Sequence, residues 1–136
     1  MADLTITRQD VALSTSAVSF IRVQVAEAVT QGQPLYRAAT NSKYYKAAAT
    51  SATSAAATVV AMTPASAEGY CLAVKSGDVI IGATTTQGTT YVVSATAGGI
   101  APHADLGSGN YVTTLGIAIS ATVIRLNIQA SGIAIP

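Results

Sequence analysis

The chain has 136 residues and a formal net charge of +1, and half of its residues are small, with 27 Ala, 18 Thr, 12 Ser and 11 Gly. This length disfavours a second independent core. The apolar half of the composition disfavours disorder, because disordered chains combine low hydrophobicity with high net charge. The near-neutral charge disfavours a general nucleic-acid binder.

The N-terminal residues have neither the basic start nor the apolar run of a secretory signal. No apolar window approaches the roughly 18 residues of a membrane helix. We therefore expect synthesis in a cytoplasm and no membrane partner. Residues 1–16 are polar and are predicted to form an extended arm or a first edge strand, and residues 17–136 to form a single β domain.

Alternating apolar residues predict a half-buried strand within residues 17–30. Phe20, Val23 and Val25 are expected to face inward, and Arg22 and Gln24 to face solvent. A Gly-Gln-Pro turn then leads into a hairpin.

The hairpin is predicted to pair a strand at 35–38 with one at 43–46. Tyr36 is expected to pair across it with Tyr44 or Tyr45. Residues 47–58 are rich in Ala, Ser and Thr, and they favour a short, exposed helix or a single helical turn.

The rest of the chain carries β signals at the spacing typical of a sandwich or barrel. Ser76-Gly77-Asp78 is predicted to be a tight turn, residues 98–110 a long loop, and Gly116 a bulge or bend. Residues 133–136 are apolar on both faces and suggest packing against another subunit or against the shell of a partner. The expected strands cover residues 58–62, 70–74, 79–82, 90–94, 111–119 and 122–128.

The fold class predicted from these elements is all-β. The length suits a compact β-barrel or jelly-roll-like sandwich of about nine or ten short strands, with at most one short helix near residues 47–58.

Residues with catalytic chemistry are sparse. His103 is the single histidine, and it lies with Asp105 in a Pro/Gly loop without a nucleophile elbow. Asp78 and Asp105 could form a carboxylate pair for glycoside hydrolysis, which leaves a small enzyme as a minor hypothesis. The lone Cys71 is expected to be a buried hydrophobe. No ligand spacing indicates a metal or a cofactor.

Basic and aromatic residues alternate over residues 22–46. Such a pattern is able to contact single-stranded nucleic acid. The outer face of a hairpin is the favoured interpretation, so no nucleic-acid partner is expected. A protein interface is the third interpretation, because Tyr and Arg are enriched at interface hot spots.

Several Gly-anchored turns resemble those of capsid decoration (cement) proteins of tailed bacteriophages. The resemblance covers most of the chain and rests on Gly-Gln-Pro-Leu-Tyr at 32–36, Lys-Tyr-Tyr-Lys-Ala at 43–47, Ser-Gly-Asp-Val-Ile-Ile-Gly at 76–82, Gly-Thr-Thr-Tyr at 88–91, Gly-Gly-Ile-Ala-Pro at 98–102, Gly-Asn-Tyr-Val at 109–112 and Leu-Gly-Ile-Ala at 115–118. It implies a non-enzymatic virion protein made in a bacterial host. Such a protein binds the capsid exterior as a homodimer or homotrimer and clamps neighbouring major capsid protein subunits.

Two sets of residues are the candidate capsid contacts. The first is the N-terminal arm, whose residues have no obvious local partners, and its removal is expected to weaken shell binding and to leave the folded core intact. The second is one face of the hairpin. The candidates are Asp3, Leu4, Ile6 and Arg8 in the arm, and Arg37, Tyr44 and Lys46 in the hairpin. A receptor-binding module of a tail fibre or spike is the alternative function, because it shares this Thr/Ser/Gly-rich β composition.

Overall fold

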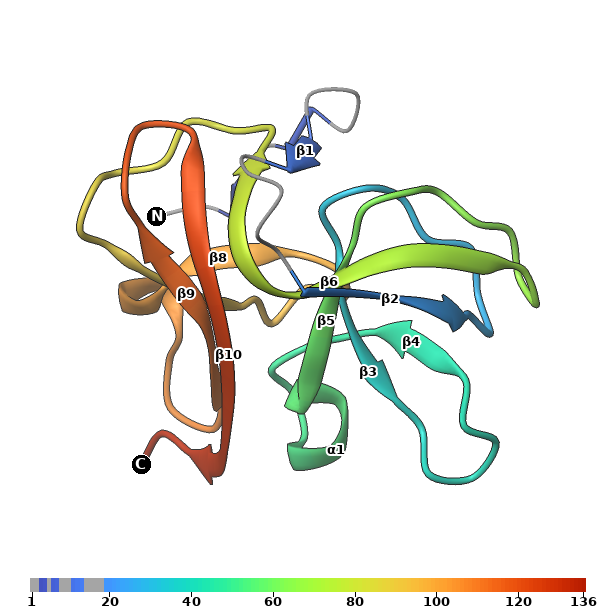
Figure 1. Ribbon diagram of the computed structural model, residues 1–136. Coiled ribbons are helices and arrows are strands. Elements are labelled where there is room, and N and C mark those ends of the chain that lie inside the picture. Colours follow the sequence, from blue (N-terminus) through green and yellow to red (C-terminus); the bar gives the residue numbers. More distant parts are fainter. Residues whose placement is uncertain (1–2, 5, 8–10, 14–18) are drawn as a thin grey trace.

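The computed structural model describes residues 3–4, 6–7, 11–13 and 19–136 (Figure 1). Within them it contains ten strands, one short α-helix and one turn of 3-10 helix. In chain order these are β1 (Val11–Leu13), β2 (Ser19–Gln24), β3 (Pro34–Arg37), β4 (Tyr44–Lys46), α1 (Ala52–Ala55), β5 (Ala57–Ala61), β6 (Tyr70–Ile81), β7 (Thr90–Val93), β8 (Ile100–Pro102), η2 (His103–Asp105), β9 (Tyr111–Ala118) and β10 (Val123–Ala134). The all-β prediction and the single short α-helix are confirmed.

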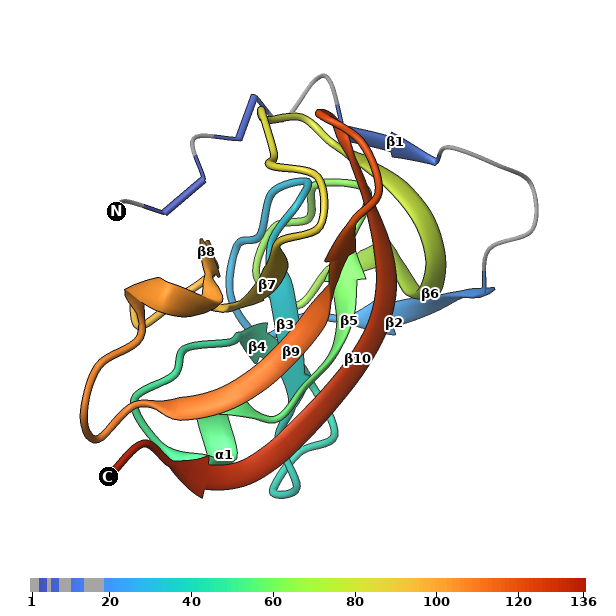
Figure 2. The ribbon, with the colours of Figure 1, turned by 90° about the vertical axis from the view of Figure 1, so that its left-hand side faces the viewer.

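All ten strands belong to one sheet, in the order β4-β3-β5-β6-β10-β9-β7-β8, and β1 and β2 also pair with β6. Every pair of neighbouring strands is antiparallel. The sheet curls into a barrel-like shape, as the two perpendicular views show (Figures 1 and 2). The curl of a single sheet therefore surrounds the interior in the manner of a barrel, which is one of the two architectures that the sequence predicts.

The strand β6 connects the two halves of the sheet. Residues 70–76 pair with β2, and residues 76–80 pair with β10. The predicted tight turn at Ser76-Gly77-Asp78 is wrong, because the chain bends there but does not reverse. Gly77 has a φ of 115°, a conformation that glycine adopts at little cost, and the ladder continues on both sides of it.

We call the two halves the first and second lobes. The first lobe comprises β2–β5 and residues 70–75 of β6, and the second comprises β1, residues 76–81 of β6 and β7–β10 (Figure 1). In the first lobe an isolated parallel bridge between Val25 and Tyr44 brings the end of β2 back beside β4. That bridge completes the ring of strands β2-β6-β5-β3-β4.

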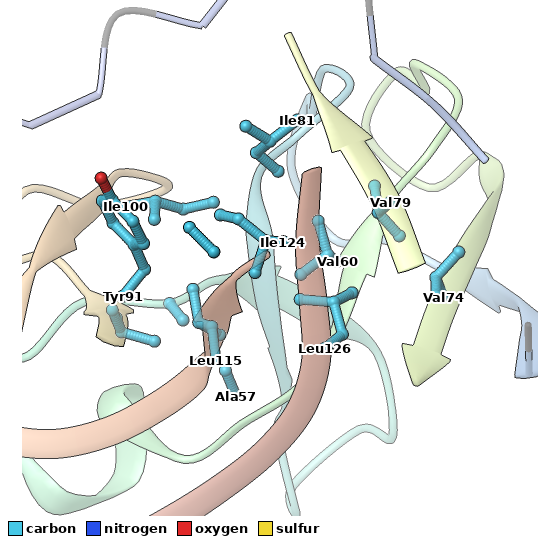
Figure 3. Close-up of a cluster of buried hydrophobic side chains, with 13 residues drawn as sticks. Ala57, Val60, Val74, Val79, Ile81, Tyr91, Ile100, Leu115, Ile124 and Leu126 are labelled. Carbon is cyan, nitrogen blue, oxygen red and sulfur yellow. The ribbon is translucent and has the colours of Figure 1, made fainter. Parts of the chain in front are cut away.

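Two clusters of buried side chains fill the interior. The main core lies mostly in the second lobe, and its large members point toward one another between β6, β7, β9 and β10 (Figure 3). It comprises Ala47, Ala57, Val60, Val74, Val79, Ile81, Tyr91, Val93, Ile100, Leu115, Ala118, Ile124 and Leu126. The small core fills the first lobe and comprises Val23, Val25, Val29, Leu35, Val59, Ala61, Cys71 and Ala73.

The inward face of β2 differs from the prediction at one position. Val23 and Val25 are buried as expected, but Phe20 is 54% exposed. Side chains alternate with a period of two, so the burial of Val23 and Val25 directs even-numbered residues outward. Phe20 therefore shares the outer face of β2 with Arg22 and Gln24.

The prediction that the Ala-rich segment is exposed holds for residues 50–53 and is wrong for residues 47–49, which are buried. Ala47 and Ala49 have no exposed surface. The Ala49 N–H donates to the Ser94 carbonyl at 2.8 Å, and the Ala49 carbonyl accepts from the Tyr111 N–H at 2.8 Å. Small side chains let this backbone pass between the lobes and bond to the second lobe. The helix α1 that follows begins at the N-cap Ser51, whose side chain accepts from the Ser54 N–H.

The remaining predictions for the second lobe hold in part. The expected loop at 98–110 instead contains β8 and η2. The register between β7 and β9 skips Leu115, so the predicted bulge beside Gly116 is confirmed. A Cβ atom on Gly116 would lie 2.1 Å from the Arg125 carbonyl oxygen, so glycine permits the close approach of β10.

Candidate binding surfaces

The described residues 3–4 and 6–7 of the N-terminal arm bond to the second lobe and to the loop that follows β6. The Ser94 hydroxyl donates to Asp3 Oδ1 at 2.7 Å, and the Leu4 N–H donates to the Ile100 carbonyl at 2.8 Å. Arg8, the fourth predicted contact of the arm, lies outside the described residues. The arm is therefore tied to β8 and to the loop after β7.

The prediction that the arm has no local partners is wrong. Leu4 and Ile6 are partly buried and pack against the main core. Ile6 also lies close to Gly32, where a Cβ atom would meet Ile6 Cγ2 at 3.0 Å. Because these two side chains cover part of the core, removal of the arm is expected to cost stability as well as any binding that the arm provides.

The hairpin brings two of its three predicted residues together. Arg37 and Tyr44 are opposite each other in the β3–β4 register, and both line an open cleft of about 260 Å³ at the end of the first lobe. Lys46 takes no part in this cleft. Its ammonium lies 3.8 Å from Glu27 Oε1, and its backbone N–H donates to Glu27 Oε2 at 3.1 Å.

We call this cleft the mouth of the first lobe. Its lining residues are Ile21, Arg37, Tyr44, Thr58, Val59 and Lys75. The sequence reasoning missed Ile21, Thr58 and Lys75, which come from strands far apart in the chain. The alternating pattern of Tyr and basic residues identified the hairpin side of the mouth alone.

Tyr36 pairs across the hairpin with Tyr45, one of its two predicted partners. Their rings stack with centroids 5.7 Å apart, and they lie on the opposite face of the hairpin from Tyr44. This confirms the predicted cross-strand pair. Tyr44, on the other face, lines the mouth.

A second surface lies on the outer face of β7, β9 and β10. It is a shallow groove of about 440 Å³ with Ile117, half exposed, in its wall. Gly116 also lines the groove. On the same face Arg125 pairs with Asp78 through two hydrogen bonds of 2.9 and 3.2 Å. The guanidinium lowers the pKa of the Asp78 carboxyl.

A third surface is the end of β10. Pairing with β6 ends at Asn127, whereas pairing with β9 continues to Ala134. Residues 128–134, which we call the β10 overhang, thus have no partner in β6, and they pair with β9 at Gln129, Ala130 and Ala134, with a register shift between Ala130 and Ala134. Figure 1 shows them below the level of β6. Ile133 is 69% exposed there, the largest exposed fraction among the large apolar residues described.

The residues considered for catalysis are spread over the molecule. His103 and Asp105 lie in η2. Asp78 lies on β6, and β10, β9 and β7 separate that strand from β8 in the sheet. Within the described residues, no three His, Cys, Asp or Glu side chains are grouped so as to hold a metal ion. Cys71 is buried in the small core, as predicted, and this burial raises the pKa of its thiol.

A scan against models of known protein families and a search of curated proteins each returned no match to this chain. The helices in the described part of the chain have four and three residues, far fewer than a bilayer-crossing helix needs. The function is therefore inferred from the surfaces of the molecule and from the turn motifs of its sequence.

Proposed function

We propose that this chain is a structural virion protein that binds the outer surface of an icosahedral phage capsid and cements neighbouring major capsid protein subunits. The observation that carries the proposal is the β10 overhang, an exposed strand with one unpaired edge and an exposed Ile133. An unpaired edge offers backbone donors and acceptors that a strand of another protein can complete.

The apolar groove beside Ile117 lies on the same two strands, β9 and β10, as the overhang. A partner strand at the overhang would therefore approach a second, apolar contact on the same lobe. Because a decorated shell presents many identical sites, modest contacts at each of them add up through multivalency in an oligomer. The net charge of +1 keeps repulsion low between copies crowded on one shell.

The sequence resemblance supports the same role. It implies a protein made in the cytoplasm of a bacterial host, assembled as a homodimer or homotrimer, and placed on the capsid exterior without a cofactor. The major capsid protein and further copies of the chain are the partners that this role requires.

Mass spectrometry and electron microscopy of purified particles from the source test the proposal directly. We expect the chain in the particles at a fixed ratio to the major capsid protein, with its density outside the shell. Particles that lack the chain would contradict the proposal. Density at the tail tip, together with binding to a host glycan, would favour the receptor-binding alternative.

A variant of the overhang tests the surface itself. Ile133→Asp places a charge on the exposed strand and is expected to weaken binding to undecorated particles by about 10-fold or more, as the loss of an apolar anchor does. Thr122→Asp, in the exposed turn before β10, is the matched control and should bind as the wild type does. Equal unfolding temperatures of both variants would show that the effect is local.

A further inference from the structure

The mouth of the first lobe is lined by side chains that regular strands would not bring together. Thr58 and Val59 are consecutive residues of β5, yet both line the mouth. In a regular strand consecutive side chains point to opposite faces. Two irregularities in strand pairing, one in β5 and one in β6, explain why additional side chains reach the mouth.

Each irregularity is a β-bulge. The register between β3 and β5 skips Thr58, and the register between β2 and β6 skips Lys75. An extra residue in one strand turns its side chain away from the regular alternation, and bulges are frequent beside functional sites for this reason. Both bulged residues line the mouth, so two neighbouring strands depart from regular pairing at one cleft.

The mouth carries two positive charges that are not balanced locally. The described lysines and arginines that form ion pairs are Lys43 with Glu68, Lys46 with Glu27, and Arg125 with Asp78. Among the described residues, neither Arg37 nor Lys75 forms an ion pair. The two cations of the mouth are thus available to a negative group brought by another molecule.

The polar and apolar groups of the mouth suit a carboxylate on an aliphatic stem. The Arg37 guanidinium donates one hydrogen bond to Ser42 Oγ at 2.8 Å, which orients it and leaves further N–H donors. Tyr44 and Thr58 also line the mouth, and each carries a hydroxyl group that is able to donate a hydrogen bond. Ile21 supplies an apolar wall that is 39% exposed.

The neighbouring edge of β2 points to a protein as the source of that carboxylate. Over residues 19–24, β2 pairs with β6 and has no second strand partner among the described residues. Phe20 is 54% exposed on this strand. An extended segment of a partner can therefore lie along β2 and direct one side chain into the mouth.

We infer that the mouth of the first lobe is a binding site for the carboxylate of an acidic side chain on a protein partner, held by Arg37 and Lys75. The preference for a carboxylate is argued from the residues that line the mouth. The identity of the partner as the shell protein rests on the proposed function.

Titration of the isotope-labelled protein with a capped glutamate, N-acetylglutamate N-methylamide, tests the site by nuclear magnetic resonance. We expect saturable shifts at the amides of residues 37, 44, 58 and 75, and much smaller shifts with the capped glutamine. The double variant Arg37→Gln/Lys75→Gln is expected to bind about 10-fold more weakly or worse, since it removes both ion pairs.

Arg22→Gln is the matched control. Arg22 lies over the Tyr70 ring at 4.6 Å to its centroid and does not line the mouth, so its loss should leave the titration unchanged. Equal shifts with the capped glutamine, or an equal loss of affinity in Arg22→Gln, would overturn the inference. Tighter binding of inorganic phosphate at the same amides would replace the carboxylate by a phosphate group and overturn it as well.

Binding to undecorated particles separates this inference from the proposed function. If the wild type binds and Arg37→Gln/Lys75→Gln binds at least about 10-fold more weakly, both are supported. If the wild type and the double variant bind equally, the role of the mouth in shell binding is overturned, although the proposed function stands. If the wild type does not bind, the proposed function fails, and the capped-glutamate titration still decides the chemistry of the mouth.

Discussion

The two lobes share β6, but they enclose different interiors. The small core of the first lobe consists of four valines, two alanines, Leu35 and Cys71. The main core contains larger side chains, among them Ile81, Tyr91 and Ile124. Hydrophobic stabilisation rises with the apolar area removed from water, so the second lobe contributes more of it. The first lobe, with its lighter interior, leaves an open mouth lined by charged and hydroxyl groups.

This difference suggests a division of labour within one sheet. The second lobe holds the arm, the groove and the β10 overhang around a well-filled core. The first lobe places two bulges and two cations at its open end. The second lobe thus has the larger buried side chains, and in the first lobe two irregularities of strand pairing meet at the mouth, where a partner is proposed to bind.

The largest effect is expected from matched truncations in the two cores. Leu115→Ala and Leu35→Ala remove the same atoms from side chains with no exposed surface. We expect Leu115→Ala to lower the free energy of unfolding by about 3–5 kcal/mol and Leu35→Ala by about 2–3 kcal/mol, because a cavity beside smaller side chains and an open end relaxes more easily. Urea unfolding measures both. A larger loss for Leu35→Ala would reverse the ranking of the lobes.

The next largest loss of unfolding free energy is expected from changes in the N-terminal arm. Leu4→Ala/Ile6→Ala removes two partly buried side chains from the main core and is expected to cost about 2–3 kcal/mol of unfolding free energy. Thr7→Ala is the control, since the Thr7 side chain is exposed and its backbone N–H still donates to the Gly82 carbonyl. An unchanged urea midpoint for the double variant would show that the arm does not stabilise the second lobe.

Gly116→Ala tests the close approach of β9 and β10 within the second lobe. A Cβ atom there would clash with the Arg125 carbonyl oxygen, so the two strands have to separate, at a cost of about 1–3 kcal/mol. Gly107→Ala is the control because an added Cβ atom meets nothing within 4 Å there. Thermal unfolding compares the two variants, and equal melting temperatures would contradict the close packing of these strands.

Most strands of both lobes were predictable because apolar alternation is a local signal. The bend in β6 was not, since Ser-Gly-Asp predicts a positive φ at Gly77 but not whether the chain reverses. That outcome depends on pairing with β10, which lies more than 40 residues later. The mouth itself was not predicted. Of its residues, the sequence singled out Arg37 and Tyr44 alone, as part of a hairpin face, because the bulges that place Thr58 and Lys75 arise from the register of distant strands.

The partners of the arm escaped prediction for the same reason. Ser94, which binds Asp3, lies 91 residues away in the chain. Apolar residues at two alternate positions, Leu4 and Ile6, were the available signal that the arm covers a core. Two apolar positions in a short polar segment are too few to show by their alternation whether the arm packs on the core or extends into solvent.

The smallest expected change in stability comes from Asp78, at the point where β6 passes from the first lobe to the second. Asp78 lies beside Gly77, and its hydrogen bonds to Arg125 lower the pKa of its carboxyl in the folded protein. Between the folded and unfolded pKa values the unfolded state binds more protons, so stability rises with pH in this range. The contribution of the pair is thus present above the unfolded pKa of about 3.9 and is lost as the pH falls through the folded value.

Asp78→Asn removes this titration. We expect the variant to be slightly less stable than the wild type at pH 7, and the difference to disappear at acidic pH, where the carboxyl of the wild type is protonated. Urea unfolding from pH 7 down to pH 2 measures the difference, and the same substitution in an Arg125→Gln background should show none of it. A difference that persists in that background would mean that the bend of β6, and not the ion pair across to β10, sets how the two lobes are joined.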